Sequence, residues 1–381
     1  MKLLVIHNKY RVLGGEDVAV ENEIKFLKKH FDLRTIYFSN QEKNMIALIS
    51  SLFFNKNLKN MKKIKSEILC FKPDYVYIHN TWFMVPLSLF KFLRSKKIGT
   101  ILKLHNFRYD CTRTYISKKH ILSNETCNAC GMKMEKYRYF NKYFENSYLK
   151  SFFIIKYGKK LYKILKYENI KLFVLTGFHK NHLIQLGHDK NKIYIYQNFT
   201  EIRKKTNNAK KGNYIVYAGR VSAEKGIKEL IYSFKLSNLR DFKLKIIGDG
   251  PDLKKLKYKY SSENIEFYGM LSNSETLEII SNSKAVVTAT KLFEGQPTLL
   301  CEASSMAIPS IFPKTGGIGE FFPENYELSF EQFNYNDLVQ KLNLLIDTNY
   351  ILDIGQKNKE YISQYLNEHR LLQNIKSALN E

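Results

Sequence analysis

Two glutamates, Glu294 and Glu302, bracket a segment whose residue types suit the binding of a phosphate group. The segment follows a short β-rich run, residues 285–290, and contains Pro297, which suits a first helical position because its missing N–H costs nothing there. The next three residues would present unpaired backbone N–H groups at the positive end of that helix, where anions bind. These residues are Thr298, Leu299 and Leu300.

The two carboxylates cannot bind that anion themselves, because all three groups are negative. We expect Glu294 and Glu302 to accept hydrogen bonds from hydroxyl groups attached to the anion, such as those of a sugar and of a ribose. The alternative is a solvated helix start with incidental glutamates. Residues elsewhere in the chain must decide between these two interpretations.

Composition indicates a folded chain with more than one domain. The 381 residues exceed one ordinary core, and 44% of them are apolar and 14% aromatic. No apolar run approaches the roughly 18 residues needed to cross a bilayer, and the N-terminus lacks a signal-peptide pattern. Five cysteines, an odd number, are typical of reduced thiols in a cytoplasm. We therefore expect a cytoplasmic protein, either soluble or peripheral on the inner face of the cell membrane.

The positive charge is concentrated in the first half of the chain. Of the net charge of +25, residues 1–200 carry +23, from 37 basic and 14 acidic residues. Residues 201–381 carry 24 basic and 22 acidic residues. The first half is therefore expected to face something anionic, and the candidates are nucleic acid, anionic lipid and a substrate that carries a diphosphate.

The N-terminal pattern is typical of a doubly wound α/β domain. A strand at 2–7 runs into a loop with Gly14 and Gly15, and a helix follows at about 17–30. The loop lacks the full G-x-G-x-x-G pattern, so it predicts no dinucleotide site. The two glycines either allow a close approach of the backbone to a ligand or form an ordinary turn. Further strands are predicted at 33–38, 75–78, 100–104, 172–176 and 193–196.

Two of these predicted strands end in the same dipeptide, His79-Asn80 and His105-Asn106. Ligands of α/β domains bind at the carboxyl ends of the strands. The pattern therefore places two imidazoles where a ligand is expected. The alternative is that both histidines are structural.

Three cysteines lie close together in the sequence after the second of these strands. Cys127 and Cys130 have the separation of a metal-binding knuckle, and Cys111 could supply a third thiolate. A structural zinc would need a fourth ligand such as His105 or His120. The alternative is a loop of reduced cysteines without metal.

Two segments combine lysines with apolar residues. They are residues 45–69 and 151–167. Both suit the interface of an anionic membrane, where each lysine contributes on the order of 1 kcal/mol. The alternative is a pair of helices that pack on the core and expose a solvated basic face.

The second half reads as another α/β unit. Residues 201–213 are polar and read as a linker, and a strand at 214–217 opens the unit, so we expect domains at 1–200 and 214–355. A last helical segment is predicted at about 354–379. Its part from 356 to 381 is expected to pack back toward the first domain.

Five motifs in this half occur in an order that resembles the retaining glycosyltransferases of family 4. They are Gly219-Arg220 with Lys225-Gly226, Gly248-Asp249-Gly250-Pro251, Gly269, Glu294 with Glu302, and Gly316-Gly317 with Glu320. The resemblance covers nearly the whole chain and is strongest over 214–320. It implies an α/β fold of the GT-B type, with two Rossmann-like doubly wound domains that face each other across a cleft.

The resemblance also implies roles for the motif residues. Arg220 and Lys225 are similar to the pair that holds the donor diphosphate, where fixed positive charge stabilises the leaving group. Glu302 is similar to the glutamate that binds the ribose, and Glu294 to the one that contacts the transferred sugar. Backbone groups of four further residues are implied in donor binding: Gly295 and Gln296 beside the sugar, and Met270 and Leu271 at the base.

In the first domain the resemblance is carried by His105, which is similar to the histidine near the reacting sugar. Gly14 and Gly15 resemble the loop that approaches the diphosphate or the acceptor. One departure concerns Glu294, which the family usually follows with proline or glycine and a Phe-Gly pair. Here Gly-Gln-Pro-Thr follows it.

The implied reaction is displacement on the same face of the sugar, with retention at the anomeric carbon, from a UDP- or GDP-linked donor. No Asp-x-Asp motif occurs, so no obligatory metal cofactor is expected. The basic first half suits a lipid-linked saccharide acceptor of O-antigen, capsule or related polysaccharide synthesis. Nucleic acid is not expected as a partner, because the chain has no zinc-finger, helix-turn-helix or RNP pattern. The alternatives are a nucleotide-sugar epimerase of the same fold and a non-catalytic partner subunit.

Overall fold

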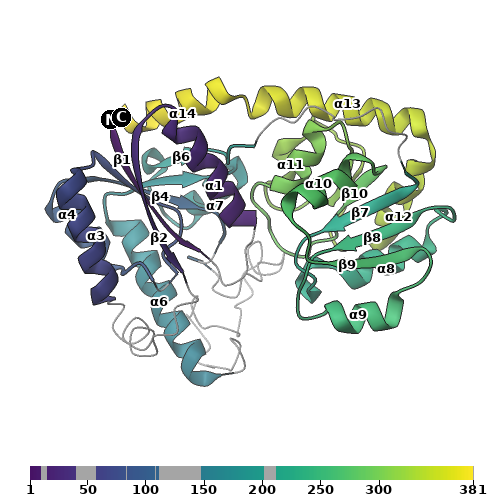
Figure 1. Cartoon of the computed structure of the whole chain (residues 1–381), viewed down its shortest axis with the longest axis horizontal. Helices are drawn as coiled ribbons and strands as arrows, with labels where there is room; N and C mark the ends of the chain where they lie inside the picture. Colours follow the sequence, from purple (N-terminus) through teal and green to yellow (C-terminus); the bar gives the residue numbers. More distant parts are fainter. Residues whose placement is uncertain are drawn as a thin grey trace. The chain divides into compact units, whose positions relative to one another are not determined.

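The computed structural model describes residues 1–9, 15–39, 57–82, 84–107, 109–110, 147–200 and 212–380. The chain divides into two compact units (Figure 1). The first unit comprises Met1–Phe199 and Leu371–Glu381, and the second comprises Thr200–Arg370.

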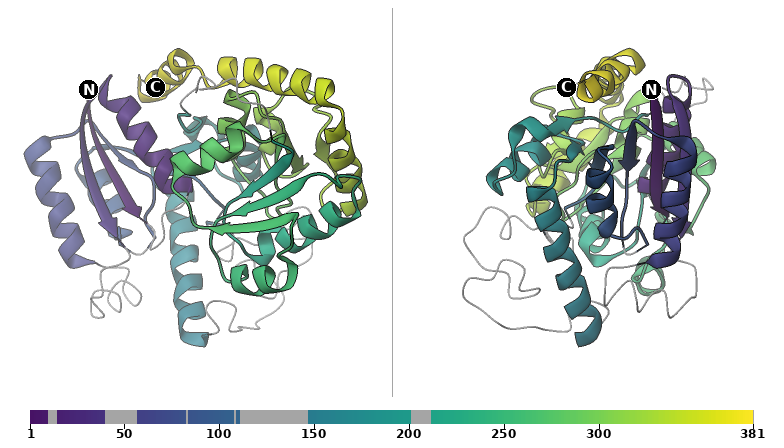
Figure 2. Two further views of the ribbon diagram at one scale, coloured as in Figure 1. Left: turned by 45° about the vertical axis from the view of Figure 1, so that its right-hand side comes forward. Right: turned by 90° about the vertical axis from the view of Figure 1, so that its left-hand side faces the viewer.

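The first unit is built on a six-stranded parallel sheet in the order β2-β1-β3-β4-β5-β6. Helices lie on both faces of this sheet (Figure 2). The strands are therefore apolar on both sides, and residues 3–6 of the first strand are all buried. The strands are β1 (Lys2–Lys9), β2 (Asp32–Ser39), β3 (Tyr75–Ile78), β4 (Gly99–Leu104), β5 (Lys171–Val174) and β6 (Ile193–Ile195).

Most helices of the first unit connect successive strands. Side-chain caps mark several helix starts; for example, Asn57 accepts the N–H of Asn60 and Thr176 accepts that of His179. The helices are α1 (Gly15–Lys28), α3 (Leu58–Phe71), α4 (Ser88–Ser95), α6 (Tyr148–Tyr167), α7 (Gly177–Gln185) and α14 (Glu368–Asn380), with the 3-10 turn η1 (Lys190–Lys192).

The second unit repeats the plan with a parallel sheet in the order β12-β11-β10-β7-β8-β9. Its strands are β7 (Tyr214–Ala218), β8 (Lys243–Ile247), β9 (Ile265–Gly269), β10 (Ala285–Val287), β11 (Ser310–Pro313) and β12 (Ser329–Phe330). Its helices are α8 (Ile227–Leu236), α9 (Leu253–Tyr260), α10 (Asn273–Ser281), α11 (Thr298–Ser305), α12 (Tyr335–Asn343) and α13 (Thr348–Tyr365). The 3-10 turns are η2 (Ala223–Lys225), η3 (Ile318–Phe321) and η4 (Leu344–Ile346). The predicted α/β class with two Rossmann-like units is confirmed.

The prediction of one terminal helix over 354–379 is wrong, because the chain forms two helices there. Helix α13 ends at Tyr365, and the side chain of Asn367 accepts the N–H groups of His369 and Arg370 at the start of α14. The break redirects the chain from one core to another. Ile362 lies in a core of the second unit, whereas Ile375 lies in the core of the first.

Because of this break, the boundary between the two units lies later in the chain than the boundary predicted from the sequence. The predicted second domain ends at 355, but α13 continues to pack on the second unit as far as Leu366. Only α14 joins the first unit. There the carbonyl of Leu379 accepts a hydrogen bond from the Tyr75 hydroxyl, and that of Ala378 accepts one from Lys171.

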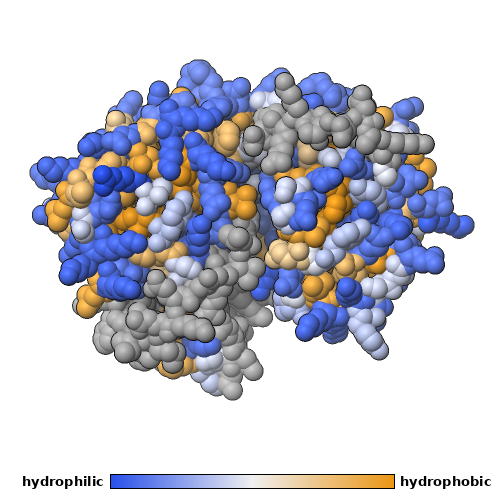
Figure 3. Space-filling view, viewed as in Figure 1, coloured by the Kyte–Doolittle hydropathy of each residue, from blue (hydrophilic) through white to orange (hydrophobic). Residues whose placement is uncertain are grey.

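The face in Figure 3 carries hydrophilic side chains over much of its area, with hydrophobic side chains between them. Within the described part of the chain, no helix combines the length and the apolar character that crossing a membrane requires.

Candidate functional site

Two loops at the carboxyl edge of the second sheet bring Lys225 and Glu294 together. The first loop follows β7 and the second follows β10, its neighbour in the sheet. The Lys225 ammonium donates a hydrogen bond of 2.5 Å to Oε1 of Glu294, and the Thr290 hydroxyl donates one of 2.9 Å to the same oxygen. Both Lys225 and Glu294 are partly exposed, so a ligand at this edge can reach them.

The backbone of Glu294 is held by a third loop, which follows β11. The N–H of Gly317 donates to the carbonyl of Glu294 at 2.9 Å. Gly316 adopts φ +57°, and a Cβ at this position would lie 2.3 Å from the same carbonyl oxygen. Only glycine fits there without strain. The Gly-Gly motif therefore sets the position of Glu294.

Gly316→Ala is expected to destabilise the second unit by about 2 to 5 kcal/mol. A left-handed conformation costs roughly 1–2 kcal/mol for alanine, and overpacking adds about 1–3 kcal/mol. Urea denaturation measures the loss. Gly319→Ala is the matched control, because nothing lies within 4 Å of its Cβ position. Equal midpoints for the two variants would contradict the contact with Glu294.

Another glycine places the Lys225 loop. Gly226 adopts φ +70°, and a Cβ there would lie 2.0 Å from the carbonyl oxygen of Ala289. The 3-10 turn η2 therefore packs directly on the chain that leaves β10. The close approach explains why glycine must follow Lys225.

Helix α11 begins one residue later than predicted, with Pro297 at the N-cap position. The expectation of an unpaired N–H at Thr298 is wrong, because this N–H donates to the carbonyl of Gln296 at 3.1 Å. Leu299 is half-buried and Leu300 is buried in the first turn. Of the three N–H groups that were expected to be unpaired, the one of Thr298 is therefore hydrogen-bonded in the turn that precedes the helix.

Glu302 and Gln296 are both buried. The Gln296 side chain donates to the hydroxyl of Thr200 at 3.4 Å. Glu302 lies in the second turn of α11, as predicted, beside the fully buried Cys301. Burial, together with the charge of Glu302, raises the pKa of the Cys301 thiol well above its usual value.

The remaining predicted donor residues follow the carboxyl ends of strands in the same sheet. Arg220 is exposed after β7, and its carbonyl accepts a hydrogen bond from the Tyr217 hydroxyl at 2.8 Å. Met270 is exposed and Leu271 half-buried after β9. Gly295 is partly exposed beside Glu294. The second sheet therefore presents all these residues from one edge, where α/β domains bind ligands.

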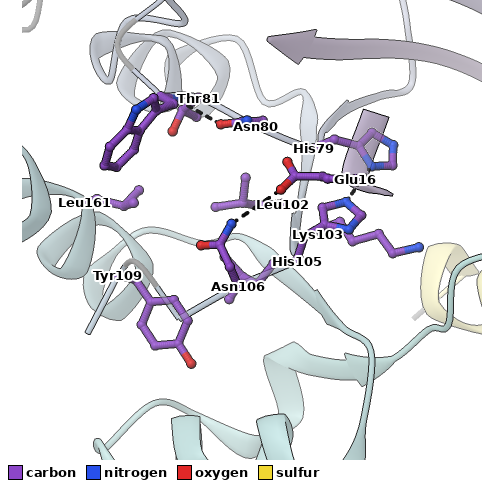
Figure 4. A pocket seen from close by; sticks show the side chains of 12 residues that line it. Glu16, His79, Asn80, Thr81, Leu102, Lys103, His105, Asn106, Tyr109 and Leu161 are labelled. Atoms are coloured by element: carbon purple, nitrogen blue, oxygen red, sulfur yellow. Dashed lines mark hydrogen bonds between the residues drawn. The ribbon is translucent and has the colours of Figure 1, made fainter. Parts of the chain in front are cut away.

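The first unit has a pocket at the carboxyl edge of its own sheet (Figure 4). Nδ1 of His79 lies 3.1 Å from Nε2 of His105, so the structure brings the two predicted histidines together. Nδ2 of Asn106 donates to the Glu16 carboxylate at 3.4 Å. The pocket is lined by imidazole, amide, carboxylate and aromatic groups, which include Asn80, Trp82 and Tyr109.

The other predicted residues of the first unit are only partly described. Gly14 lies outside the described residues, and Gly15 begins α1 with no atom within 4 Å of its Cβ position. Cys111, Cys127, Cys130 and His120 also lie outside the described residues. Within the ranges that the structure describes, no group of three or more metal-ligating side chains gathers.

Sequence reasoning missed a third histidine at this edge. His7 lies near the end of β1, beside β3 in the sheet, and its Nε2 is 2.9 Å from Oδ1 of Asp17 on α1. The signal was available, because His7-Asn8 repeats the dipeptide found after β3 and β4.

A buried ion pair was also missed. Lys103 Nζ lies 2.6 Å from Oε2 of Glu23, and both side chains are fully buried. The Tyr77 hydroxyl donates to the same carboxylate at 2.6 Å, and Lys103 also donates to the carbonyl of Gln197. Burial lowers the pKa of Lys103 although Glu23 acts in the opposite direction.

The sequence of the chain is similar to those of known glycosyltransferases. Residues 198–366 match the family model of the glycosyl transferases group 1. The uncharacterized glycosyltransferase MJ1178 of Methanocaldococcus jannaschii is 26% identical, over 96% of this chain and 94% of that protein. The amylovoran biosynthesis glycosyltransferase AmsD of Erwinia amylovora is 29% identical, over 37% of this chain and 42% of its own length.

Among solved structures, HepE of Anabaena, crystallised with UDP and glucose, is similar to the whole chain. It has a TM-score of 0.70 at 15% identity, with 100% of this chain and 99% of that chain covered. This similarity shows the fold, which is that of the GT-B glycosyltransferases. The second unit therefore matches the glycosyl transferases group 1 over nearly its whole length, and the comparisons support a glycosyltransferase activity.

Proposed function

We propose that this chain is a retaining glycosyltransferase that moves a sugar from a nucleotide diphosphate to a saccharide acceptor. The observation that carries the proposal is the Lys225–Glu294 pair, held by Thr290 and Gly317 at the carboxyl edge of the second sheet. A cation fixed at this edge suits a diphosphate, and a carboxylate beside it suits the hydroxyl groups of the attached sugar.

The chemistry follows from the charges. As the bond from the anomeric carbon to the diphosphate oxygen breaks, negative charge grows on the diphosphate, and Lys225 and Arg220 stabilise it. Lys225 exchanges its bond to Glu294 for a bond to the phosphate. Glu294 is then available to accept hydrogen bonds from the transferred sugar.

A UDP-linked donor is favoured over a GDP-linked one. The support comes from the Anabaena structure with UDP and glucose, which shares the fold of the whole chain. Glu302 binds the ribose in this proposal, because it is the buried carboxylate on the helix that follows Glu294. Met270 and Leu271 contact the base.

The two glutamates are expected to have different effects when truncated. Glu302→Ala should weaken UDP binding on the order of tenfold, through the loss of a hydrogen bond to the ribose. Glu294→Ala should lower kcat by about 10²-fold and leave UDP binding unchanged or tighter, because it releases Lys225. Calorimetry with UDP and turnover assays measure the two effects. Equal losses of UDP affinity in the two variants would refute the assignment of nucleotide binding to Glu302 and of turnover to Glu294.

A panel of nucleotide sugars incubated with the purified protein tests the function itself. Release of UDP, with the α or β configuration of the donor kept in the product by NMR, is the expected result. Epimerised nucleotide sugar without UDP release would instead indicate an epimerase. No consumption of any donor would indicate a non-catalytic partner subunit.

We further propose a lipid-linked saccharide acceptor, as in envelope polysaccharide synthesis, and a peripheral position on the inner face of the cell membrane. Support comes from the similarity to the amylovoran enzyme and from the net charge of +23 over residues 1–200. Helices α3 and α6 each bury one side and expose lysines on the other. Exposed apolar residues accompany these lysines, and they are Leu58 and Leu69 on α3 and Tyr148, Leu149 and Phe152 on α6.

Vesicle flotation is expected to show binding to anionic vesicles that weakens as salt is added, because the attraction is electrostatic. Neutral phosphatidylcholine vesicles serve as the control. Equal binding to neutral and anionic vesicles at low salt would contradict a membrane role of the basic first half.

A further inference from the structure

The rings of His79 and His105 form a hydrogen-bonded pair at the edge of the pocket in the first unit (Figure 4). Their centroids are 5.4 Å apart and the rings are inclined by 26°. His79 is 3% exposed, whereas His105 is partly exposed. Both imidazoles line the pocket, and His105 is the more accessible of the two to a ligand.

The second ring nitrogen of His79 restricts where its proton resides. Within the described part of the chain, Nε2 of His79 is buried and has no hydrogen-bond partner. The rings of Tyr77, at 4.3 Å, and His7, at 6.2 Å, are its aromatic neighbours. A proton on Nε2 would be a buried donor without an acceptor, which folded proteins tolerate less than an unmatched acceptor. The proton therefore belongs on Nδ1, which faces His105.

Both rings are neutral near pH 7. Burial lowers the pKa of His79 well below its usual value, and the neighbouring His105 and Lys103 add to this effect. Burial likewise lowers the pKa of His105, and Lys103 adds to it. A neutral His79 that donates from Nδ1 makes Nε2 of His105 an acceptor. The single proton of His105 is then on its own Nδ1.

We propose that His79 is a positioning residue that holds His105 in the tautomer protonated on Nδ1, so that His105 offers an N–H donor to an oxygen of the bound saccharide. The role of His105 rests on the proposed function, whereas its tautomer does not. In this tautomer His105 acts toward the saccharide as a hydrogen-bond donor and not as a general base.

Among the described residues, no carboxylate is hydrogen-bonded to either ring of the pair, and this supports the role. In a catalytic triad, an aspartate stabilises the imidazolium and makes the histidine an effective base. Here Asp17 is bonded to His7, and Glu23 is bonded to Lys103. Among the residues that the structure describes, the hydrogen-bond partner of His105 is the neutral His79. His79 therefore supplies no charge that would stabilise an imidazolium at His105, and the Glu16 carboxylate of the same pocket accepts a hydrogen bond from Asn106.

Three variants test the pair. His79→Asn keeps an N–H donor near the position of Nδ1, whereas His79→Leu removes it. His79→Leu is expected to lower kcat on the order of tenfold with little change in the KM for the nucleotide sugar, and His79→Asn should restore most of the rate. His188→Asn is the control, because it removes a buried imidazole that does not line the pocket.

The tautomer is read directly by NMR of protein labelled with ¹⁵N in the histidine rings. We expect His105 to carry its proton on Nδ1 in the wild type and in His79→Asn, and to shift toward the Nε2 form in His79→Leu. A wild-type His105 protonated on Nε2 would overturn the proposal, and so would an unchanged tautomer in His79→Leu. The spectrum needs no substrate. If the tautomer is as expected but no nucleotide sugar is consumed, the proposed function fails and the positioning role of His79 stands.

Discussion

Lys225→Met is expected to lower kcat/KM for sugar transfer by about 10²- to 10³-fold. In the structure Lys225 is the cation that Glu294 holds at the carboxyl edge of the second sheet. In the proposed reaction, removing it takes away a fixed charge that stabilises the growing charge of the diphosphate. It also leaves the Glu294 carboxylate uncompensated beside that diphosphate, so repulsion adds to the loss.

Lys291→Met is the matched control for this variant. Lys291 lies on the loop that carries Glu294, and it forms an ion pair of 2.7 Å with Glu229 that is exposed to a similar extent. Its loss is expected to change stability by no more than about 1 kcal/mol and to leave the rate within about twofold. Comparable losses of rate in the two variants would show that the general charge of the edge matters, rather than the position of Lys225.

The double variant Lys225→Met/Glu294→Gln separates the two contributions. If repulsion from the unpaired Glu294 accounts for part of the loss, nucleotide affinity should recover in the double variant, while kcat should remain low. Titration with UDP measures the affinity, and turnover with a saturating donor measures kcat. No recovery of affinity would mean that repulsion by Glu294 contributes nothing.

Lys103→Met is expected to destabilise the first unit by about 3 to 5 kcal/mol, because it leaves the Glu23 carboxylate charged and buried. Both side chains are fully buried and lie 2.6 Å apart. The Tyr77 hydroxyl would remain bonded to the carboxylate, but one neutral donor does not replace an ammonium group. Urea denaturation followed by circular dichroism measures the loss.

Lys103→Met/Glu23→Gln should regain most of this stability, because no charge is then buried and the amide oxygen still accepts from Tyr77. Arg34→Met is a control, because its ion pair with Glu67 is exposed and should contribute no more than about 1 kcal/mol. If the double variant is no more stable than the single one, packing of the Lys103 stem accounts for the loss, rather than the unpaired charge.

Much of the fold could be predicted from local patterns. Apolar runs such as 75–78 and 214–217 became strands because a parallel sheet covered on both faces requires continuous apolar residues. The helix start at Asn367 was missed, although the apolar positions change phase there: Ile362 and Ile375 lie 13 residues apart, about 220° around an α-helix. That break sends two parts of one apparent helix to different cores.

The motifs proposed to bind the donor could be identified in the sequence from their residue types and spacing. Glycine at 316 and a carboxylate at 294 can be identified from residue type alone, whereas the approach of the Gly316 Cβ position to within 2.3 Å of the Glu294 carbonyl depends on the packing of two loops. The repeated His-Asn dipeptides at strand ends can likewise be identified in the sequence, and His7-Asn8 is the one that was not predicted to belong to the site.

The partners of these residues could not be read from the sequence, because they depend on strand order and on which side of a strand faces a helix. Lys225 and Glu294 meet because β7 and β10 are neighbours, and His79 and His105 meet because β3 and β4 are. Lys103 lies in an apolar strand, where a lysine carries no sign of a partner 80 residues away. Its burial against Glu23 is a consequence of α1 packing on the sheet. The residue types therefore indicate what chemistry is possible, and the packing of strands and helices determines which groups carry it out together.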